Sequence, residues 1–199
     1  MKILVVGASG TMGRAVVDEL KQRHEIVTAS RSGGDHKVDL TDLQSIRTLF
    51  EQVGNVDAVV SAAGNVHFGP LLEMTPEQHH VGLSDKLMGQ VYLALEAARH
   101  LNAGGSVTLV AGTLSRDPVR FGASASLVNG AIEGFVRAAA IEFPPGTRIN
   151  VVSPTVLRES MDAYGPYFRG TEGVPAKRVA LAFSKSVEGA QTGQVYFVE

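Results

Sequence analysis

The sequence contains no cysteine, and its formal net charge is only −2. Without cysteine the chain can form no disulfide and can offer no thiolate for catalysis or metal binding, which fits a reducing compartment. A balance of charge so close to zero provides no electrostatic attraction for nucleic acid or for an anionic membrane surface. The composition therefore predicts neither nucleic acid nor a membrane as a partner.

Long hydrophobic runs are also missing. The N-terminal segment MKILVVGASG enters a strand at once, and its apolar run is four residues long, Ile3–Val6. This is too short for the apolar region of a signal peptide or for a membrane span, so we expect a cytoplasmic protein. The neighbouring His79 and His80 point to different sides of a helix, and we expect no metal site.

Short β-branched runs alternate with longer helical patterns along the 199 residues. Several of the runs are apolar at consecutive positions, as in strands that are covered on both faces of a parallel sheet. The alternation predicts one α/β domain over residues 1–199 with right-handed crossovers and a doubly wound parallel sheet. We expect strands at Ile3–Val6, Ile26–Ser30, Ala58–Ala63, Ser106–Gly112, Arg148–Ser153 and Gln194–Glu199, and helices near 11–23, 41–53, 76–101, 126–143 and 175–185. The segment 155–174 is irregular and long enough to be a substrate loop.

Three glycines lie between the first strand and the first helix. Gly7, Gly10 and Gly13 follow the strand at three-residue spacing in VVGASGTMG. Bare backbone there can turn tightly and approach a diphosphate, whose charge meets the positive N-terminus of the helix. The segment predicts a dinucleotide-binding loop, and the alternative is a glycine-rich turn with no ligand.

The end of the second strand favours NADP over NAD. A carboxylate about 20 residues past the loop would bind the ribose hydroxyl of NAD. This chain instead has Ser30 and Arg31 there, and a guanidinium can hold a 2′-phosphate with two parallel hydrogen bonds. The alternative is that Arg31 is a solvated loop residue.

Several further motifs are spread over essentially the whole chain. They are GASGTMG near the N-terminus, VDLTD around Asp39, SAAG at Ser61–Gly64, INVVSPTV around Pro154, and TGQVYFVE at the end. Together they resemble the short-chain dehydrogenase/reductase family, which implies a Rossmann-type fold and an NADP(H) cofactor. The cofactor-binding residues that the resemblance and the loop imply are Gly7, Ser9, Gly10, Thr11, Met12, Gly13, Ser30, Arg31, Asp39, Leu40, Ala62, Ala63, Gly64 and Pro154.

The sequence departs from that family at its catalytic residues. The family's proton-donating tyrosine aligns with Ala125, and the lysine four residues later aligns with Asn129. The serine position falls on Gly112 or Thr113, and Thr113 could supply the missing hydroxyl. The family's asparagine position holds Lys86, so its asparagine and lysine are exchanged here.

The exchange suggests a rebuilt polar network. Because the two positions are neighbours in the family's fold, we expect the Lys86 ammonium to reach toward Asn129 and the cofactor ribose. The alternative is an exposed surface lysine. His67 has a side chain suited to proton transfer, although it could equally be an ordinary loop histidine. Tyr164 and Tyr167 lie on the expected substrate loop, where they could donate a proton or simply cover the pocket.

The expected function is hydride transfer between NADP(H) and a small carbonyl or conjugated substrate, with a non-standard proton donor. General acid catalysis contributes about 10²–10⁴-fold to a rate, whereas holding the reactants together contributes about 7–11 kcal/mol, so turnover can survive the loss of the tyrosine. The alternative is an inactive NADP(H)-binding sensor or regulatory module.

Helices near 87–101 and 126–143 correspond to those that the family pairs across a two-fold axis. Small residues on the second of them, Gly130, Ala131, Gly134 and Ala138, would allow close approach in a homodimer or homotetramer, although they could equally pack on the sheet.

Overall fold

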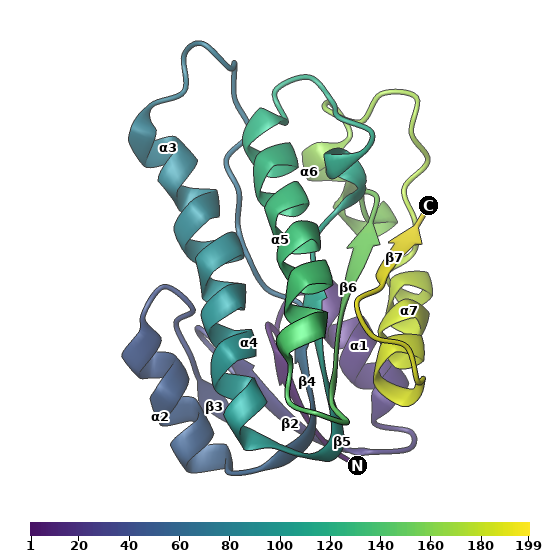
Figure 1. Cartoon of the computed structure of the whole chain (residues 1–199). Coiled ribbons are helices and arrows are strands. Elements are labelled where there is room, and N and C mark those ends of the chain that lie inside the picture. The colour runs from purple at the N-terminus through teal and green to yellow at the C-terminus, as the bar shows by residue number, and fades with distance from the viewer.

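All seven strands of the computed structural model, which describes residues 1–199, are parallel and form one sheet (Figure 1). The spatial order is β3-β2-β1-β4-β5-β6-β7, so the chain starts near the middle of the sheet and builds outward in both directions. The strands are β1 Lys2–Val6, β2 Glu25–Ser30, β3 His36–Lys37, β4 Val56–Ser61, β5 Leu101–Val110, β6 Arg148–Pro154 and β7 Val195–Val198. This is the doubly wound Rossmann-type sheet that the sequence predicts.

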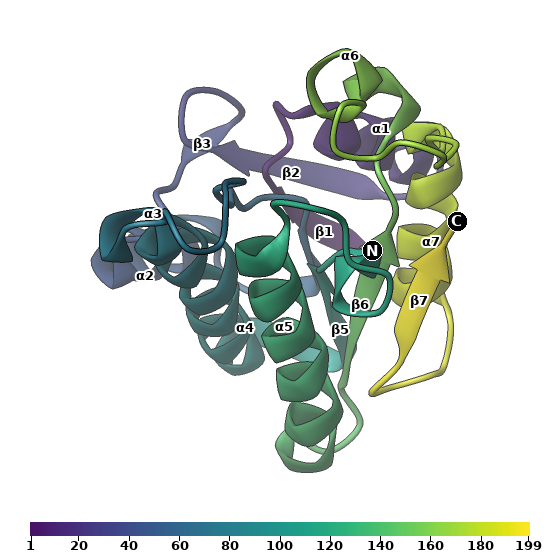
Figure 2. The same cartoon turned by 90° about the horizontal axis from the view of Figure 1, so that it is seen from above.

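Helices cover both faces of the sheet. In Figure 2, α2, α4 and α5 lie on one side, and α1 and α7 lie on the other. Their bounds are α1 Thr11–Leu20, α2 Leu43–Val53, α3 Pro76–Val81, α4 Gly89–His100, α5 Ala123–Glu142, α6 Met161–Tyr164 and α7 Ala176–Glu188. No helix is both long and apolar enough to cross a bilayer.

Two separate cores follow from the alternation of side chains along each strand. Leu4 and Val6 of β1 join the core under α2, α4 and α5, whereas Ile3 and Val5 join the core under α1 and α7. Because successive side chains point to opposite faces, a strand that is buried on both faces must be apolar at every position. This explains the continuous apolar run near the N-terminus.

The expected elements differ from the observed ones in several places. Strand β5 begins at Leu101, five residues before the expected Ser106, and ends at Val110. The predicted helix 76–101 is three consecutive pieces, α3, a π-helix at Gly82–Met88, and α4. The two-residue strand β3 was not predicted. The segment 155–174, expected to be irregular, contains a 3-10 turn at Arg158–Ser160 and the short helix α6.

Candidate active site

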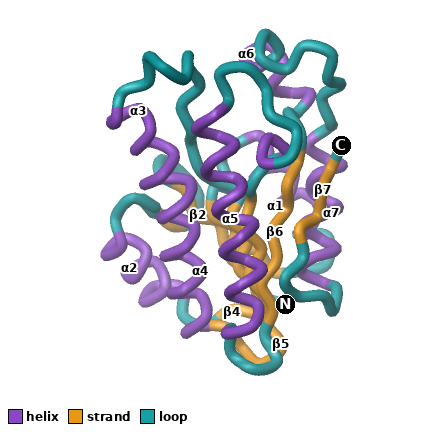
Figure 3. The backbone as a smooth tube through the Cα atoms, turned by 45° about the horizontal axis from the view of Figure 1, so that its top comes forward, coloured by secondary structure: helices purple, strands orange, loops and turns teal.

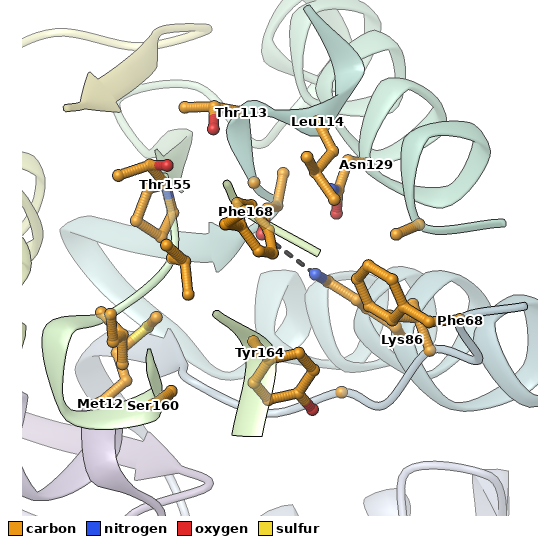
Figure 4. A pocket seen from close by; sticks show the side chains of 18 of the residues that line it. Met12, Phe68, Lys86, Thr113, Leu114, Asn129, Thr155, Ser160, Tyr164 and Phe168 are labelled. Atoms are coloured by element: carbon orange, nitrogen blue, oxygen red, sulfur yellow. Dashed lines mark hydrogen bonds between the residues drawn. The ribbon is translucent and has the colours of Figure 1, made fainter. Parts of the chain in front are cut away.

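The carboxyl ends of the strands meet at one edge of the sheet, where the long loops gather (Figure 3). Two cavities lie side by side along this edge and share Gly64 and Asn65. The outer groove is lined by Val6, Gly7, Ser9, Gly10, Ser30, Arg31, Val38, Leu40, Ala62, Ala63, Gly64, Asn65 and Asp85. The inner pocket is lined by Met12, Gly64, Asn65, Val66, Phe68, Lys86, Ala111, Gly112, Thr113, Leu114, Ala125, Asn129, Pro154, Thr155, Val156, Leu157, Ser160, Tyr164 and Phe168 (Figure 4).

The glycine loop forms the floor of the outer groove. Gly13 packs so tightly on the loop that a Cβ atom there would lie 2.0 Å from the carbonyl oxygen of Gly7. Helix α1 begins after Gly10, which has no side chain to accept a hydrogen bond from the first turn of the helix. The first-turn N–H groups therefore have no side-chain acceptor, and they carry the positive end of the helix dipole. This arrangement fits a bound diphosphate.

Arg31 stands at the rim of the outer groove between two carboxylates. Its guanidinium is 3.6 Å from Asp85 Oδ2 and 3.7 Å from Asp39 Oδ1, and its side chain is 59% exposed. Asp85 is buried and also accepts hydrogen bonds from the backbone N–H and the side-chain amide of Asn65. Asp39 accepts from the backbone N–H and hydroxyl of Thr41, and these bonds, with the nearby Arg31, lower the pKa of its carboxyl. Arg31 is thus held at the groove by two carboxylates, while more than half of its side chain remains exposed.

Lys86 lies in the π-helix and extends into the inner pocket. Its stem passes under Gly64, where an added Cβ would lie 2.6 Å from Lys86 Cγ. The Nζ atom donates a hydrogen bond to the carbonyl oxygen of Ala111 at 3.0 Å. The residue as a whole is half-buried, but its amine is enclosed by protein, and desolvation lowers the pKa of Lys86 to about 8. The insertion of π-turns into helices is frequent at functional sites.

Asn129 faces the same pocket from α5. Its side chain is 2% exposed, and its Oδ1 atom has no hydrogen-bond partner. The side-chain Nδ2 lies against the backbone of Gly112, where an added Cβ would be 2.9 Å away. Ala125, one turn earlier, contributes only a methyl group to the pocket wall. An unpartnered buried acceptor in a pocket is the feature expected where a ligand hydroxyl or amide binds.

The expected contact between Lys86 and Asn129 takes a different form. Lys86 does not point into solvent, but its hydrogen bond goes to Ala111 and not to Asn129. Since β5 ends at Val110, the carbonyl oxygen of Ala111 needs a hydrogen-bond donor from outside the strand, and the Lys86 ammonium supplies it. Lys86 therefore contacts Ala111 and Asn129 contacts the next residue, Gly112, and the two side chains form no hydrogen bond with each other.

Other predicted site residues are divided between the cavities and their surroundings. Thr113 lines the inner pocket with Pro154 and Met12, and the outer groove takes most of the remaining cofactor residues. Thr11, Gly13 and Asp39 line neither cavity. His67 is not brought into the inner pocket; its Nε2 atom lies against Gly69 in the same loop.

Aromatic side chains close the mouth of the inner pocket. Phe68 stacks at a tilt on Tyr167, with ring centroids 5.0 Å apart, and meets Tyr164 edge-on at 5.7 Å. Phe168 lines the pocket from the same segment as the two tyrosines. The loop after β4 and the segment 155–174 are therefore joined by ring contacts above the pocket.

Sequence reasoning missed two buried carboxylates beside the site. Glu133 of α5 accepts hydrogen bonds from Ser115 and Ser153, which follow Thr113 and precede Pro154. It thus ties together the two loops that form the back of the inner pocket. Asp85 and Lys86 are neighbours in the sequence, which does not show which cavity each side chain lines. In the structure the π-helix places Asp85 at the outer groove and Lys86 in the inner pocket.

The sequence matches a known protein family and is similar to a curated reductase. Residues 3–189 match the protein family described as Enoyl-(Acyl carrier protein) reductase. The chain is 31% identical to the trihydroxynaphthalene reductase PfmaI of Pestalotiopsis fici over 185 residues, which cover 79% of this chain and 65% of that protein. The chain thus spans about two thirds of the length of this curated relative.

Solved structures resemble the whole chain. The crystal structure of the protein lin1944 from Listeria innocua is 52% identical, with a TM-score of 0.98 and 100% of both chains covered. A small-chain dehydrogenase in complex with NADPH is 26% identical, with a TM-score of 0.90, covering 100% of this chain and 96% of that one.

Proposed function

Because the chain belongs to the short-chain dehydrogenase/reductase family, we propose that it is an oxidoreductase that transfers a hydride between NADP(H) and a small carbonyl or conjugated substrate. The observation that carries this proposal is the pair of adjoining cavities over the carboxyl ends of the strands. An elongated dinucleotide fits across them, with its diphosphate on the glycine loop and its nicotinamide in the inner pocket. When bound, the nicotinamide supplies or accepts the hydride.

NADP(H) is preferred over NAD(H) in this proposal because of Arg31. In the outer groove a guanidinium that is already braced by Asp39 and Asp85 can bind a 2′-phosphate. The small-chain dehydrogenase of similar structure was solved with NADPH, which supports the same choice. Titration of the protein with NADPH and NADH, followed by the fluorescence of the reduced nicotinamide, tests it: NADPH should bind at least about tenfold more tightly.

The substrate side of the proposal rests on the aromatic mouth. Phe68, Tyr164 and Phe168 provide flat apolar surfaces on which a conjugated ring can stack. The related reductase of Pestalotiopsis fici is named for an aromatic hydroxynaphthalene substrate, which favours the same kind of molecule here. A panel of aldehydes, ketones, quinones and enones should contain compounds that oxidise NADPH, with the flat conjugated members fastest.

A sensor or regulatory module is the second candidate function. The observation that favours it is Ala125, whose methyl group occupies the wall of the inner pocket where the family's proton donor would stand. Tight NADPH binding with no oxidation across the whole panel would support this candidate and would contradict the reductase.

We propose, further, that the protein is a homodimer or homotetramer built through α4 and α5. Exposed apolar side chains follow the outer face of these helices: Leu95 is 48% exposed, Leu127 is 54% and Ile141 is 87%. Gly130 and Gly134 lie between the last two on the same exposed face and leave room for a second helix. Light scattering on a size-exclusion column should give a mass of two or four chains, and Ile141→Glu should lower it to that of one chain.

A further inference from the structure

We propose that Lys86 Nζ is the group that delivers the proton to the substrate oxygen in the inner pocket. This assignment rests on the proposed reductase function and names the donor that replaces the family's tyrosine. The inner pocket contains two titratable side chains among its lining residues, Lys86 and Tyr164. The choice of donor is therefore between an amine at the centre of the pocket and a phenol at its mouth.

Tyr164 is poorly placed for the task. It belongs to the four-residue helix α6 at the surface and is 42% exposed. In Figure 4 its hydroxyl group is turned away from Lys86 and from the centre of the pocket. Its ring is held edge-on against Phe68, which suits a covering role.

Lys86 is fixed in position at both ends of its side chain. Gly64 packs on the stem, and the carbonyl oxygen of Ala111 accepts one of the three N–H bonds of the ammonium. Two N–H bonds remain for the pocket. A donor that is held by packing and by one hydrogen bond needs little reorganisation when a substrate oxygen arrives.

No carboxylate compensates the charge of Lys86. Asp85 is its neighbour in the π-helix, but that carboxylate is turned to Asn65 and Arg31 in the outer groove. Helix α5 faces Lys86 with the uncharged Ala125 and Asn129, and burial is the cause of the lowered pKa of about 8. Such an amine is about nine-tenths protonated at pH 7, yet it gives up its proton far more readily than a surface lysine.

Asn129 completes the arrangement as a positioning residue. Its buried Oδ1 atom has no partner within the protein and can accept a hydrogen bond from a hydroxyl group of a bound molecule. Because Asn129 and Lys86 adjoin Gly112 and Ala111, a ligand held by the amide lies within the reach of the amine. The acceptor that holds the ligand and the donor that protonates it therefore come from two different helices.

The proton and electron balance is that of a carbonyl reduction. The carbonyl carbon receives the hydride, the C=O π bond opens toward oxygen, and that oxygen forms a bond to the proton from Nζ. The carbonyl compound is reduced to an alcohol while the nicotinamide is oxidised. The neutral amine of Lys86 then recovers a proton from water.

Steady-state kinetics on the intact protein test the proposal. With the panel compound that wild type reduces fastest, Lys86→Met should lower kcat by about 10²–10⁴-fold while NADPH affinity changes by less than about tenfold. Lys86→Arg should be similarly slow, because a guanidinium does not release its proton. The exposed Lys177→Met is the matched control and should behave as wild type.

The pH dependence of wild type provides a second measurement. Above pH 8 kcat/KM should fall about tenfold for each pH unit, and this decrease should be absent in Lys86→Met. A third measurement does not depend on turnover: lysine signals of the isotope-labelled wild type are followed by NMR through a pH titration. The signal that Lys86→Arg removes should titrate below pH 9.

The possible failures are distinguishable. If Lys86→Met reduces the substrate at the wild-type rate, or if the Lys86 signal titrates near the ordinary lysine value, Lys86 is not the donor although the reductase function stands. If wild type oxidises NADPH with no panel compound, the proposed function fails and the donor assignment fails with it. Should Lys86→Met not fold, the NMR titration of wild type decides.

Discussion

The side-chain amide of Gln90 and the backbone of Val110 exchange two hydrogen bonds, at 2.8 and 2.9 Å. Gln90 is fully buried at the start of α4, and its amide also donates to the carbonyl oxygen of Lys86. The pairing of β5 with β4 ends at Thr108, so the backbone of Val110 has no strand on that side. One amide therefore fixes the start of α4 and the end of the π-helix, which carries Lys86, to the strand that leads to Ala111.

We expect Gln90→Met to destabilise the fold by about 2–4 kcal/mol. The substitution keeps the size of the side chain but leaves the N–H and C=O of Val110 buried without partners. Urea unfolding measures the change, and the exposed Gln22→Met should stay within about 0.5 kcal/mol of wild type. An equal loss in both variants would show that the paired hydrogen bonds have no special role.

Gly13→Ala should weaken both the fold and NADPH binding. The new Cβ would lie 2.0 Å from the carbonyl oxygen of Gly7, so the glycine loop or α1 must move, at a cost of about 1–3 kcal/mol. The control is Gln22→Ala, at an exposed position after α1. This control should stay within about 0.5 kcal/mol of wild type and leave NADPH affinity unchanged. Wild-type NADPH affinity in Gly13→Ala would contradict the assignment of the loop.

Arg31→Ala should reduce the affinity for NADPH by about 10–100-fold while NADH affinity changes little. The lost interaction is a charge-assisted hydrogen bond to the 2′-phosphate, which NADH lacks. Fluorescence titration with both dinucleotides measures the ratio. The exposed Arg120→Ala serves as a control for the loss of one positive charge. Equal losses for NADPH and NADH would rule out a role for Arg31 in cofactor choice.

Acid should destabilise the contact between α1 and α7 through Glu188. Hydrogen bonds from Arg23, then from Ser184 and His24, lower the pKa of this carboxyl to about 2. Because the unfolded chain binds the proton near pH 4.5, the stabilisation is fully present above that pH and is lost as the pH falls toward 2. Urea unfolding should show a smaller loss over this range in Glu188→Gln. Glu172→Gln, whose side chain is 90% exposed, should keep the wild-type dependence.

Ala125→Tyr with Asn129→Lys should raise the rate of simple aldehyde reduction by at least about tenfold. Both residues line the inner pocket one turn apart on α5, so the pair restores a phenol and an ammonium there. Leu181→Tyr, on the exposed face of α7, should change nothing. NADPH binding without any gain in rate would mean that the pocket no longer supports the family's chemistry.

The alternation of strands and helices and the glycine loop could be predicted because they depend on local patterns. The apolar run Ile3–Val6 is recognisable as a strand buried on both faces, and the glycines that follow it identify the loop. The helix 76–101 was predicted as continuous because its apolar spacing does not reveal the π-turns at Gly82–Met88. Periodicity averages over several turns, and one inserted residue changes it too little to detect.

The sequence by itself determined the parallel sheet and the glycine loop beside α1. Only the tertiary structure decided that Lys86 binds Ala111 instead of Asn129, that Asp85 braces Arg31, and that His67 stays outside the pocket. The physical reason is one of scale. Strand and helix patterns repeat over many residues and are set by burial, whereas a hydrogen-bond partner is chosen among groups from distant segments that packing brings within a few ångströms.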